Sequence, residues 1–140
     1  MLKLSPQLFE SIKLAGEKAF PNEGCGVILG RLHGNDREAI ELFAANNSFD
    51  ESEKYHRFLI TPDDYRSAEA KARQSKLEIL GFYHSHPDAP SVASKYDLDH
   101  AFPWFSYLIV SVMNGKYYDH HSWVMENDRS KFNLEEVIIR

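Results

Sequence analysis

The sequence predicts a single domain of the α/β class, in its α+β form, and three observations lead to this. A chain of 140 residues suits one domain with one core. Segments with helical spacing of apolar residues are interspersed with short runs of aliphatic and aromatic residues. No internal repeat, low-complexity stretch or linker divides the sequence, so residues 1–140 should form one domain.

Three segments begin with signals for a helix start. Ser5-Pro6 and Thr61-Pro62 each place a capping side chain before a proline that suits the first helical position. We expect these helices to end at about residues 20 and 75. A third helix should begin at Ser94 and end before Pro103, because the residue preceding a proline avoids the α region.

The remaining apolar runs predict strands, and Asn114-Gly115 predicts a tight hairpin turn between two of them. Polar residues 46–54 predict a loop. Trp104, Phe105 and Tyr107 are expected in the core rather than on a binding surface. The expected strands cover residues 27–29, 38–45, 55–60, 77–84, 105–113, 116–126 and 132–139.

Charge and composition exclude several classes of function. Lys plus Arg is 16 and Asp plus Glu is 21, and this net charge of −5 argues against nucleic acid as the main partner. The apolar run at residues 105–113 is too short to span a membrane, and residues 1–6 contain no apolar signal segment. The single cysteine, Cys25, excludes an internal disulfide and a Cys-rich zinc site. We therefore expect a cytoplasmic protein with no membrane partner.

The most informative stretch is His84-Ser85-His86-Pro87, followed by Ser94 and Asp97. On a strand, residues i and i+2 point to the same side, so the two imidazoles project together, and Pro87 ends the strand. Ser94 then caps a helix whose first turn carries Asp97. An isolated His-x-His is commonly a surface feature, and Ser-x-x-Asp is commonly only a cap. Together, two imidazoles and one carboxylate form the ligand set of a catalytic zinc site with a position left for water.

A hydrolytic enzyme also needs a proton acceptor, and Glu23 is the candidate. It precedes an apolar strand and adjoins the small residues Gly24, Cys25 and Gly26, although such a glutamate is ordinarily solvated. A second interpretation makes Cys25 a nucleophile with His84 as its base. A lone cysteine is more often a small buried apolar residue, and this interpretation leaves the metal pattern unexplained.

These residues resemble the signature of the JAMM metallopeptidases, also called MPN-plus domains. The signature is an upstream Glu, then His-x-His, seven residues, Ser, two residues and Asp, which Glu23, His84, His86, Ser94 and Asp97 match without a gap. The resemblance implies a curved mixed sheet flanked by helices, like that of cytidine deaminases. It also implies that His84, His86 and Asp97 bind one catalytic zinc ion, that Glu23 is the general acid/base, and that Ser94 assists the substrate carbonyl.

The resemblance further implies hydrolysis of a peptide or isopeptide bond by zinc-activated water. The family cleaves after the C-terminal Gly-Gly of ubiquitin-like proteins. Only residues 88–93 separate Pro87 from Ser94, and Pro21-Asn22-Glu23-Gly24-Cys25-Gly26 is similar to the Pro-x-Glu-x-Cys-Gly of the compact prokaryotic branch. That branch implies a ubiquitin-like sulfur-carrier protein as partner, whose extended tail could add along a sheet edge. The alternative is a non-catalytic MPN-type scaffold, and the sequence does not indicate an oligomeric state.

Overall fold

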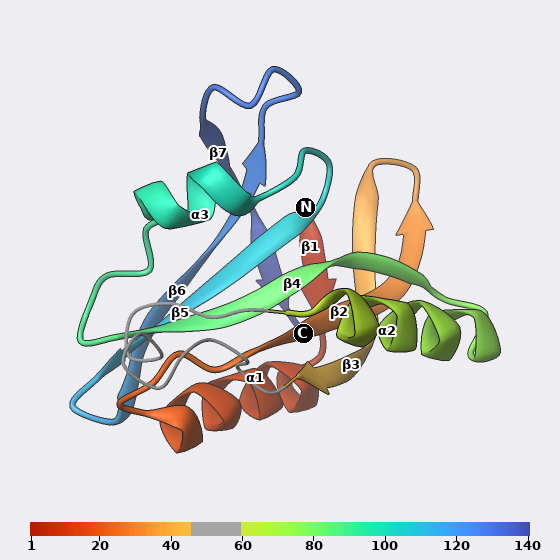
Figure 1. The fold of residues 1–140 in the computed structure, drawn as a ribbon. Coiled ribbons are helices and arrows are strands. Elements are labelled where there is room, and N and C mark those ends of the chain that lie inside the picture. Colours follow the sequence, from red (N-terminus) through yellow and green to blue (C-terminus); the bar gives the residue numbers. More distant parts are fainter. Residues whose placement is uncertain (46–59) are drawn as a thin grey trace.

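The computed structural model describes residues 1–45 and 60–140, and it confirms an α+β fold with a curved mixed sheet (Figure 1). The expected loop at 46–54 and the expected strand at 55–60 lie outside the described residues, except for Ile60. In chain order the described elements are β1 (Leu2–Leu4), α1 (Pro6–Ala19), β2 (Cys25–His33), β3 (Asp36–Ala45), α2 (Pro62–Gln74), β4 (Glu78–Pro87), α3 (Lys95–His100), β5 (Ser106–Met113), β6 (Lys116–Met125), β7 (Phe132–Glu135) and β8 (Val137–Ile139).

All described strands belong to one sheet of eight strands in the order β7-β6-β5-β4-β2-β3-β1-β8. The pairs β1–β3, β1–β8 and β4–β5 are parallel, and the other pairs are antiparallel. The Asn114-Gly115 turn between β5 and β6 is confirmed, with positive φ at both residues. The parallel β4–β5 pair requires a crossover, and that crossover carries α3.

The expectation of one final strand over 132–139 is wrong. Residues Phe132–Glu135 pair with β6 at one end of the sheet, whereas Val137–Ile139 pair with β1 at the other end. Between them, the Glu136 carbonyl accepts a hydrogen bond from Leu2 N–H at 2.8 Å. This segment therefore runs from one end of the sheet to the other, which a strongly curved sheet permits.

Strand β1 was not predicted from the sequence. Leu2 and Leu4 are buried, and the strand pairs with both β3 and β8. Three residues are too short for an alternating pattern to be recognised. Long-range pairing therefore determines this strand.

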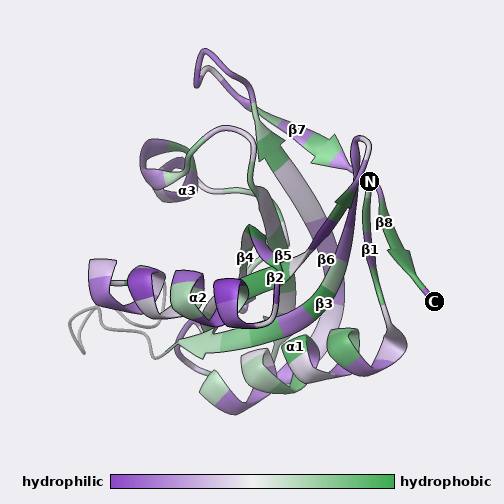
Figure 2. Ribbon diagram, turned by 90° about the vertical axis from the view of Figure 1, so that its right-hand side faces the viewer, coloured by the Kyte–Doolittle hydropathy of each residue, from purple (hydrophilic) through white to green (hydrophobic). Residues whose placement is uncertain are grey.

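The three helices of residues 1–45 and 60–140 begin at the predicted caps. Ser5 Oγ accepts a hydrogen bond from Leu8 N–H at 3.1 Å, and Thr61 and Asp64 form a reciprocal capping box. Figure 2 shows α1 on one side of the sheet and α2 with α3 on the other. Each side has its own apolar cluster: Phe9 and Ile12 of α1 belong to the first, and Ala68 and Ala72 of α2 to the second.

Alternation along β4 determines which side chains face α2 and α3. Phe82 packs in the cluster below α2, so His84 and His86 point to that same side. Ser85 points toward α1, where the absence of a side chain at Gly16 permits close packing: a Cβ there would lie 3.0 Å from Ser85 Cβ.

Not all of the expected core aromatics are buried. Tyr107 is buried, but Trp104 is 43% exposed, so the core assignment of Trp104 is wrong. Its ring lies at the surface with the Arg37 guanidinium 4.4 Å from the ring centroid. Among the described residues, no helix combines the length and apolar character needed to cross a membrane.

Candidate metal centre

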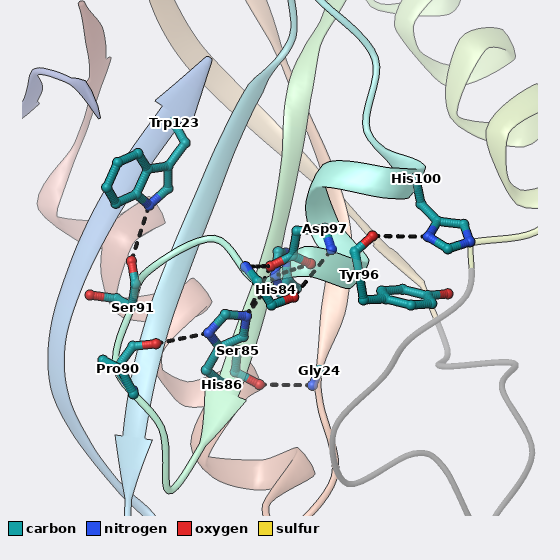
Figure 3. A network of polar contacts seen from close by, with 11 residues as sticks. Gly24, His84, Ser85, His86, Pro90, Ser91, Tyr96, Asp97, His100 and Trp123 are labelled. Carbon is teal, nitrogen blue, oxygen red and sulfur yellow. Dashed lines mark hydrogen bonds and ion pairs between the residues drawn. The ribbon is translucent and has the colours of Figure 1, made fainter. Parts of the chain in front are cut away.

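Two imidazoles and one carboxylate meet where β4 ends and α3 begins (Figure 3). The Nε2 atoms of His84 and His86 are 3.2 Å apart. Asp97 Oδ1 lies 3.3 Å from His84 Nε2, and Asp97 Oδ2 lies 3.3 Å from His86 Nε2. All three side chains are buried.

These separations fit a metal ion. In a tetrahedral zinc site with bonds of about 2.0–2.1 Å, neighbouring donor atoms lie about 3.3 Å apart. The observed separations of 3.2, 3.3 and 3.3 Å are of this size, with the two Asp97 oxygens each facing one of the imidazole nitrogens. Nitrogen and carboxylate donors are also the types that zinc accepts.

Local structure holds the carboxylate in place. Ser94 Oγ accepts a hydrogen bond from Asp97 N–H at 3.1 Å, and Asp97 Oδ2 accepts one from Ser94 N–H at 2.8 Å. This capping box lets the first turn of α3 direct a carboxylate at β4. Burial alone would raise the pKa of Asp97, but His84 and then His86 hold that pKa well below its usual range. Asp97 is therefore an anion in this site.

Glu23 lies in the same place as these residues. It is only 5% exposed, and a carboxylate oxygen of Glu23 and one ring nitrogen each of His84 and His86 lie within 4.8 Å of one another. Burial raises the pKa of Glu23 to about 7, against a lowering by His84 and His86, while Asp97 raises it further. A carboxyl with a pKa near neutrality can both accept and donate a proton at physiological pH.

Two hydrogen bonds fix the segment that carries Glu23. Gly24 N–H donates to Ser85 Oγ at 2.8 Å, and Ser85 N–H donates to the Gly24 carbonyl at 3.0 Å. Ser85 lies between the two histidines, so the glutamate segment is joined to the strand that presents both imidazoles.

The environment of Cys25 disfavours a nucleophilic thiol. The side chain is buried, and its Sγ donates to the Ala45 carbonyl at 3.9 Å. Burial, followed by the nearby charges of Glu23 and Asp64, raises the pKa of the Cys25 thiol to about 12. A thiol with this pKa remains protonated at neutral pH, and the thiolate is the reactive form.

The candidate metal ligands adjoin a large cavity. Its volume is about 680 Å³, and His84 and Asp97 form part of its wall. Aromatic side chains make much of the rest, among them Tyr65, Phe82 and Tyr107. The cavity is thus an apolar space between α2 and α3 that lies beside the candidate metal ligands.

Comparison with protein families identifies the family of this chain. The model described as "Prokaryotic homologs of the JAB domain" matches residues 5–126. The chain belongs to this JAB family. Its members are typically metallohydrolases, and the resemblance to JAMM proteins drawn from the motif is confirmed.

Solved structures confirm the JAB fold along the whole chain. A solution structure of a protein from Desulfitobacterium hafniense is 31% identical, with 100% of this chain and 93% of that chain covered and a TM-score of 0.87. A structure described as "JAMM: A Metalloprotease-like Zinc Site in the Proteasome and Signalosome" is 17% identical, with 100% and 98% covered and a TM-score of 0.60.

A curated relative is a protein named desampylase from Pyrococcus furiosus. It is 20% identical over 112 residues, which cover 80% of this chain and 75% of the relative. The JAB-family chain described here thus has relatives that include an enzyme by name.

The structure brings together the five predicted site residues, Glu23, His84, His86, Ser94 and Asp97. Sequence reasoning missed the supporting contacts of Ser85 and of Pro90, whose carbonyl lies 2.8 Å from His86 Nδ1. The alternation of β4 indicates that Ser85 faces away from the imidazoles, but no local pattern indicates that it contacts Gly24.

Proposed function

We propose that this JAB-family protein is a zinc-dependent peptidase or isopeptidase. It hydrolyses the amide bond after the C-terminal Gly-Gly of a ubiquitin-like sulfur-carrier protein. The observation that carries the proposal is the convergence of Glu23, with a pKa of about 7, on the ring nitrogens of His84 and His86, which also contact Asp97.

His84, His86 and Asp97 would hold the zinc ion. Bound there, zinc would act as a Lewis acid that acidifies the attacking water and polarises the substrate carbonyl. Pro90 supports this role, because its carbonyl accepts a hydrogen bond from His86 Nδ1 at 2.8 Å and so leaves Nε2 as the donor atom toward the metal.

Glu23 is the proposed general acid/base. Its carboxylate removes a proton from the attacking water and later delivers that proton to the departing amine. Burial keeps the proton from exchanging freely with bulk solvent, and the pKa of about 7 suits both directions of transfer.

Ser94 is proposed to stabilise charge on the substrate carbonyl oxygen. Its oxygen accepts the Asp97 N–H bond, which leaves the hydroxyl hydrogen to donate outward from an exposed position. Such a donor contributes most when charge develops on the carbonyl oxygen in the transition state.

Two observations support a ubiquitin-like substrate. The Pyrococcus furiosus relative is named for a desampylase activity. The cavity of about 680 Å³ beside His84 and Asp97 has room for several residues of an extended tail. The sulfur-carrier subclass follows from the Pro21–Gly26 segment and the short connection at residues 88–93, which are similar to the compact branch.

The test is incubation of the zinc-loaded protein with the host's own Gly-Gly-ending sulfur carriers, each extended by one or more residues. Intact mass should show loss of the extension and a carrier that ends in Gly-Gly. The Glu23→Gln variant, with zinc bound, should leave the extended carriers intact. A protein that purifies without stoichiometric zinc and cleaves none of these carriers would instead be the non-catalytic scaffold.

A further inference from the structure

The connection between β4 and α3 is held residue by residue against the β5–β6 hairpin. Asp88 N–H donates to the Val112 carbonyl at 2.7 Å. Ser111 Oγ donates to the Ala89 carbonyl at 2.6 Å. This connection runs from His86 to the helix that carries Asp97, so its conformation determines whether these two side chains meet.

Pro90 links the conformation of this connection to the orientation of the His86 ring. The Pro90 carbonyl can only accept a hydrogen bond, so the Nδ1 atom 2.8 Å away must carry the hydrogen. A neutral imidazole with hydrogen on Nδ1 presents a lone pair on Nε2, the atom 3.3 Å from Asp97. If Pro90 moved, His86 would lose the contact that selects both its ring orientation and its tautomer.

Ser91 is the most strongly anchored residue of the connection. The residue is only 1% exposed, and its Oγ donates to Asp119 Oδ1 at 2.8 Å. A hydroxyl has one hydrogen, so His121 Nδ1, at 2.6 Å, must donate to the same oxygen. The Ser91 carbonyl also accepts a hydrogen bond from Trp123 Nε1 at 3.0 Å, as Figure 3 shows.

A serine, a histidine and an aspartate in contact suggest a second hydrolytic centre, but their geometry excludes it. The Ser91 hydroxyl is buried, so a substrate carbonyl cannot reach it. In a catalytic triad the carboxylate orients the histidine, and the histidine accepts the serine proton. Here Asp119 itself accepts the hydrogen bond from the Ser91 hydroxyl, and His121 Nδ1 donates a hydrogen bond to the Ser91 oxygen.

We infer that Ser91, Asp119 and His121 are positioning residues for the metal ligands. They pin the β4–α3 connection to β6, so that Pro90 stays on His86 Nδ1 and α3 keeps Asp97 within 3.3 Å of both imidazoles. The metal part of this inference rests on the proposed function. The ordering of the connection does not, because every hydrogen bond that carries it lies within the protein.

The experiment compares four variants. Ser91→Ala and His121→Ala remove hydrogen bonds that tie Ser91 to β6. His121→Asn places an amide donor near the former Nδ1 position and should preserve the hydrogen bond to Ser91 Oγ. His120→Ala is the matched control, since His120 is adjacent on β6 but faces α1, with its Nδ1 2.8 Å from Tyr117 Oη and its ring 4.6 Å from Phe9.

Two measurements are made on each folded variant. Zinc affinity is determined by competition with a chromophoric chelator, and amide hydrogen exchange is followed in residues 88–94. We expect Ser91→Ala and His121→Ala to raise the zinc dissociation constant by about 10- to 100-fold. We also expect them to accelerate exchange in this segment. His121→Asn and His120→Ala should change the affinity by much less than the about tenfold lower bound expected for the first two variants.

Ser91→Ala with parental zinc affinity and parental exchange at 88–94 would overturn the inference. The same holds if His120→Ala weakens zinc binding as much as His121→Ala, because the effect would then be general destabilisation of β6. A parent protein that binds no zinc would refute the proposed function instead, and the exchange rates would still decide whether Ser91 orders the connection.

Discussion

Ser85 Oγ accepts a hydrogen bond from the Gly24 amide at 2.8 Å, across 61 positions of sequence. Ser85 stands between the two imidazoles of the candidate metal centre, and Gly24 directly follows the candidate base, Glu23. This one contact therefore aligns the candidate acid/base group with the strand that carries the two candidate histidine ligands.

Replacing Ser85 with alanine should cost both stability and turnover. The Gly24 N–H would lose its buried acceptor, which costs about 1–3 kcal/mol of unfolding free energy. Zinc affinity should change little, since His84 and His86 remain. Urea unfolding and steady-state kinetics measure the two effects. Ser122→Ala is the control, because Ser122 is also buried but donates to Glu135 at 2.7 Å. If both serine variants keep full turnover when folded, the alignment role fails.

Glu23→Gln should leave zinc bound and remove nearly all turnover. The amide keeps the shape of the side chain, but it cannot take a proton from water. A loss of about 10²–10⁴-fold is typical when a general acid/base is removed. Metal content by mass spectrometry and cleavage by intact mass are the readouts. Turnover close to that of the parent protein would end the assignment of Glu23.

Removing a metal-binding side chain should reduce zinc content. His86→Ala and Asp97→Ala each leave two of the three proposed ligands. Zinc affinity should therefore fall by more than it does when a residue that only supports a ligand is replaced, which typically costs about 10- to 100-fold. Asp97→Asn separates ligation from helix capping, because its amide oxygen can still accept the Ser94 N–H bond. Helix α3 should survive in Asp97→Asn while zinc affinity drops. Undiminished metal content in His86→Ala would contradict the ligand set.

The metal-free protein should become less stable as pH rises from 5 to 8. The folded-state pKa of Glu23 is about 7 against a usual 4.5, so its contribution is fully present below pH 4.5 and lost as pH rises through 7. This amounts to at most about 3 kcal/mol. Burial would lower the pKa of His86, but Asp97 raises it, so His86 acts in the same direction at higher pH. Burial lowers the pKa of His120, which opposes the trend.

Calorimetry in a chelator, compared with Glu23→Gln, isolates the contribution of the glutamate. The variant should show a flatter pH dependence between 5 and 7. With zinc bound, stability should instead fall as pH decreases, because imidazoles bind metal only when deprotonated. Metal binding and activity should both weaken below about pH 6. Identical pH slopes for the parent protein and Glu23→Gln would contradict the raised pKa of Glu23.

Local chemistry explains which elements could be predicted. Each helix begins at a capping side chain that lies within three residues of its partner, such as Ser5 with Leu8 and Ser94 with Asp97. The metal-binding pattern is also local, since residues 84–97 span one strand end and one helix start. By contrast, β1 and the break at residue 136 depend on pairing between opposite ends of the chain.

The supporting contacts of the site could not be predicted for the same reason. Ser91 and Asp119 are 28 residues apart, and they meet only because β6 pairs beside β5. Trp104 was misplaced because its aromatic neighbours resemble a strand, whereas its φ of 80° marks a turn. The location of Glu23 depended on a family pattern, since a glutamate in a loop gives no sign of burial.

Residues 132–139 pair with strands at both ends of the sheet, so the edges of both strands stay open until this segment has folded. Strand β1 has a partner on each side only when Val137–Ile139 have joined it, and β6 obtains its second partner only from Phe132–Glu135. Until residues 132–139 have paired, both strands present an open edge to other chains. Pairing of this one segment therefore covers two distant edges together, and it leaves the short strands β7 and β8 as the outermost strands of the described sheet.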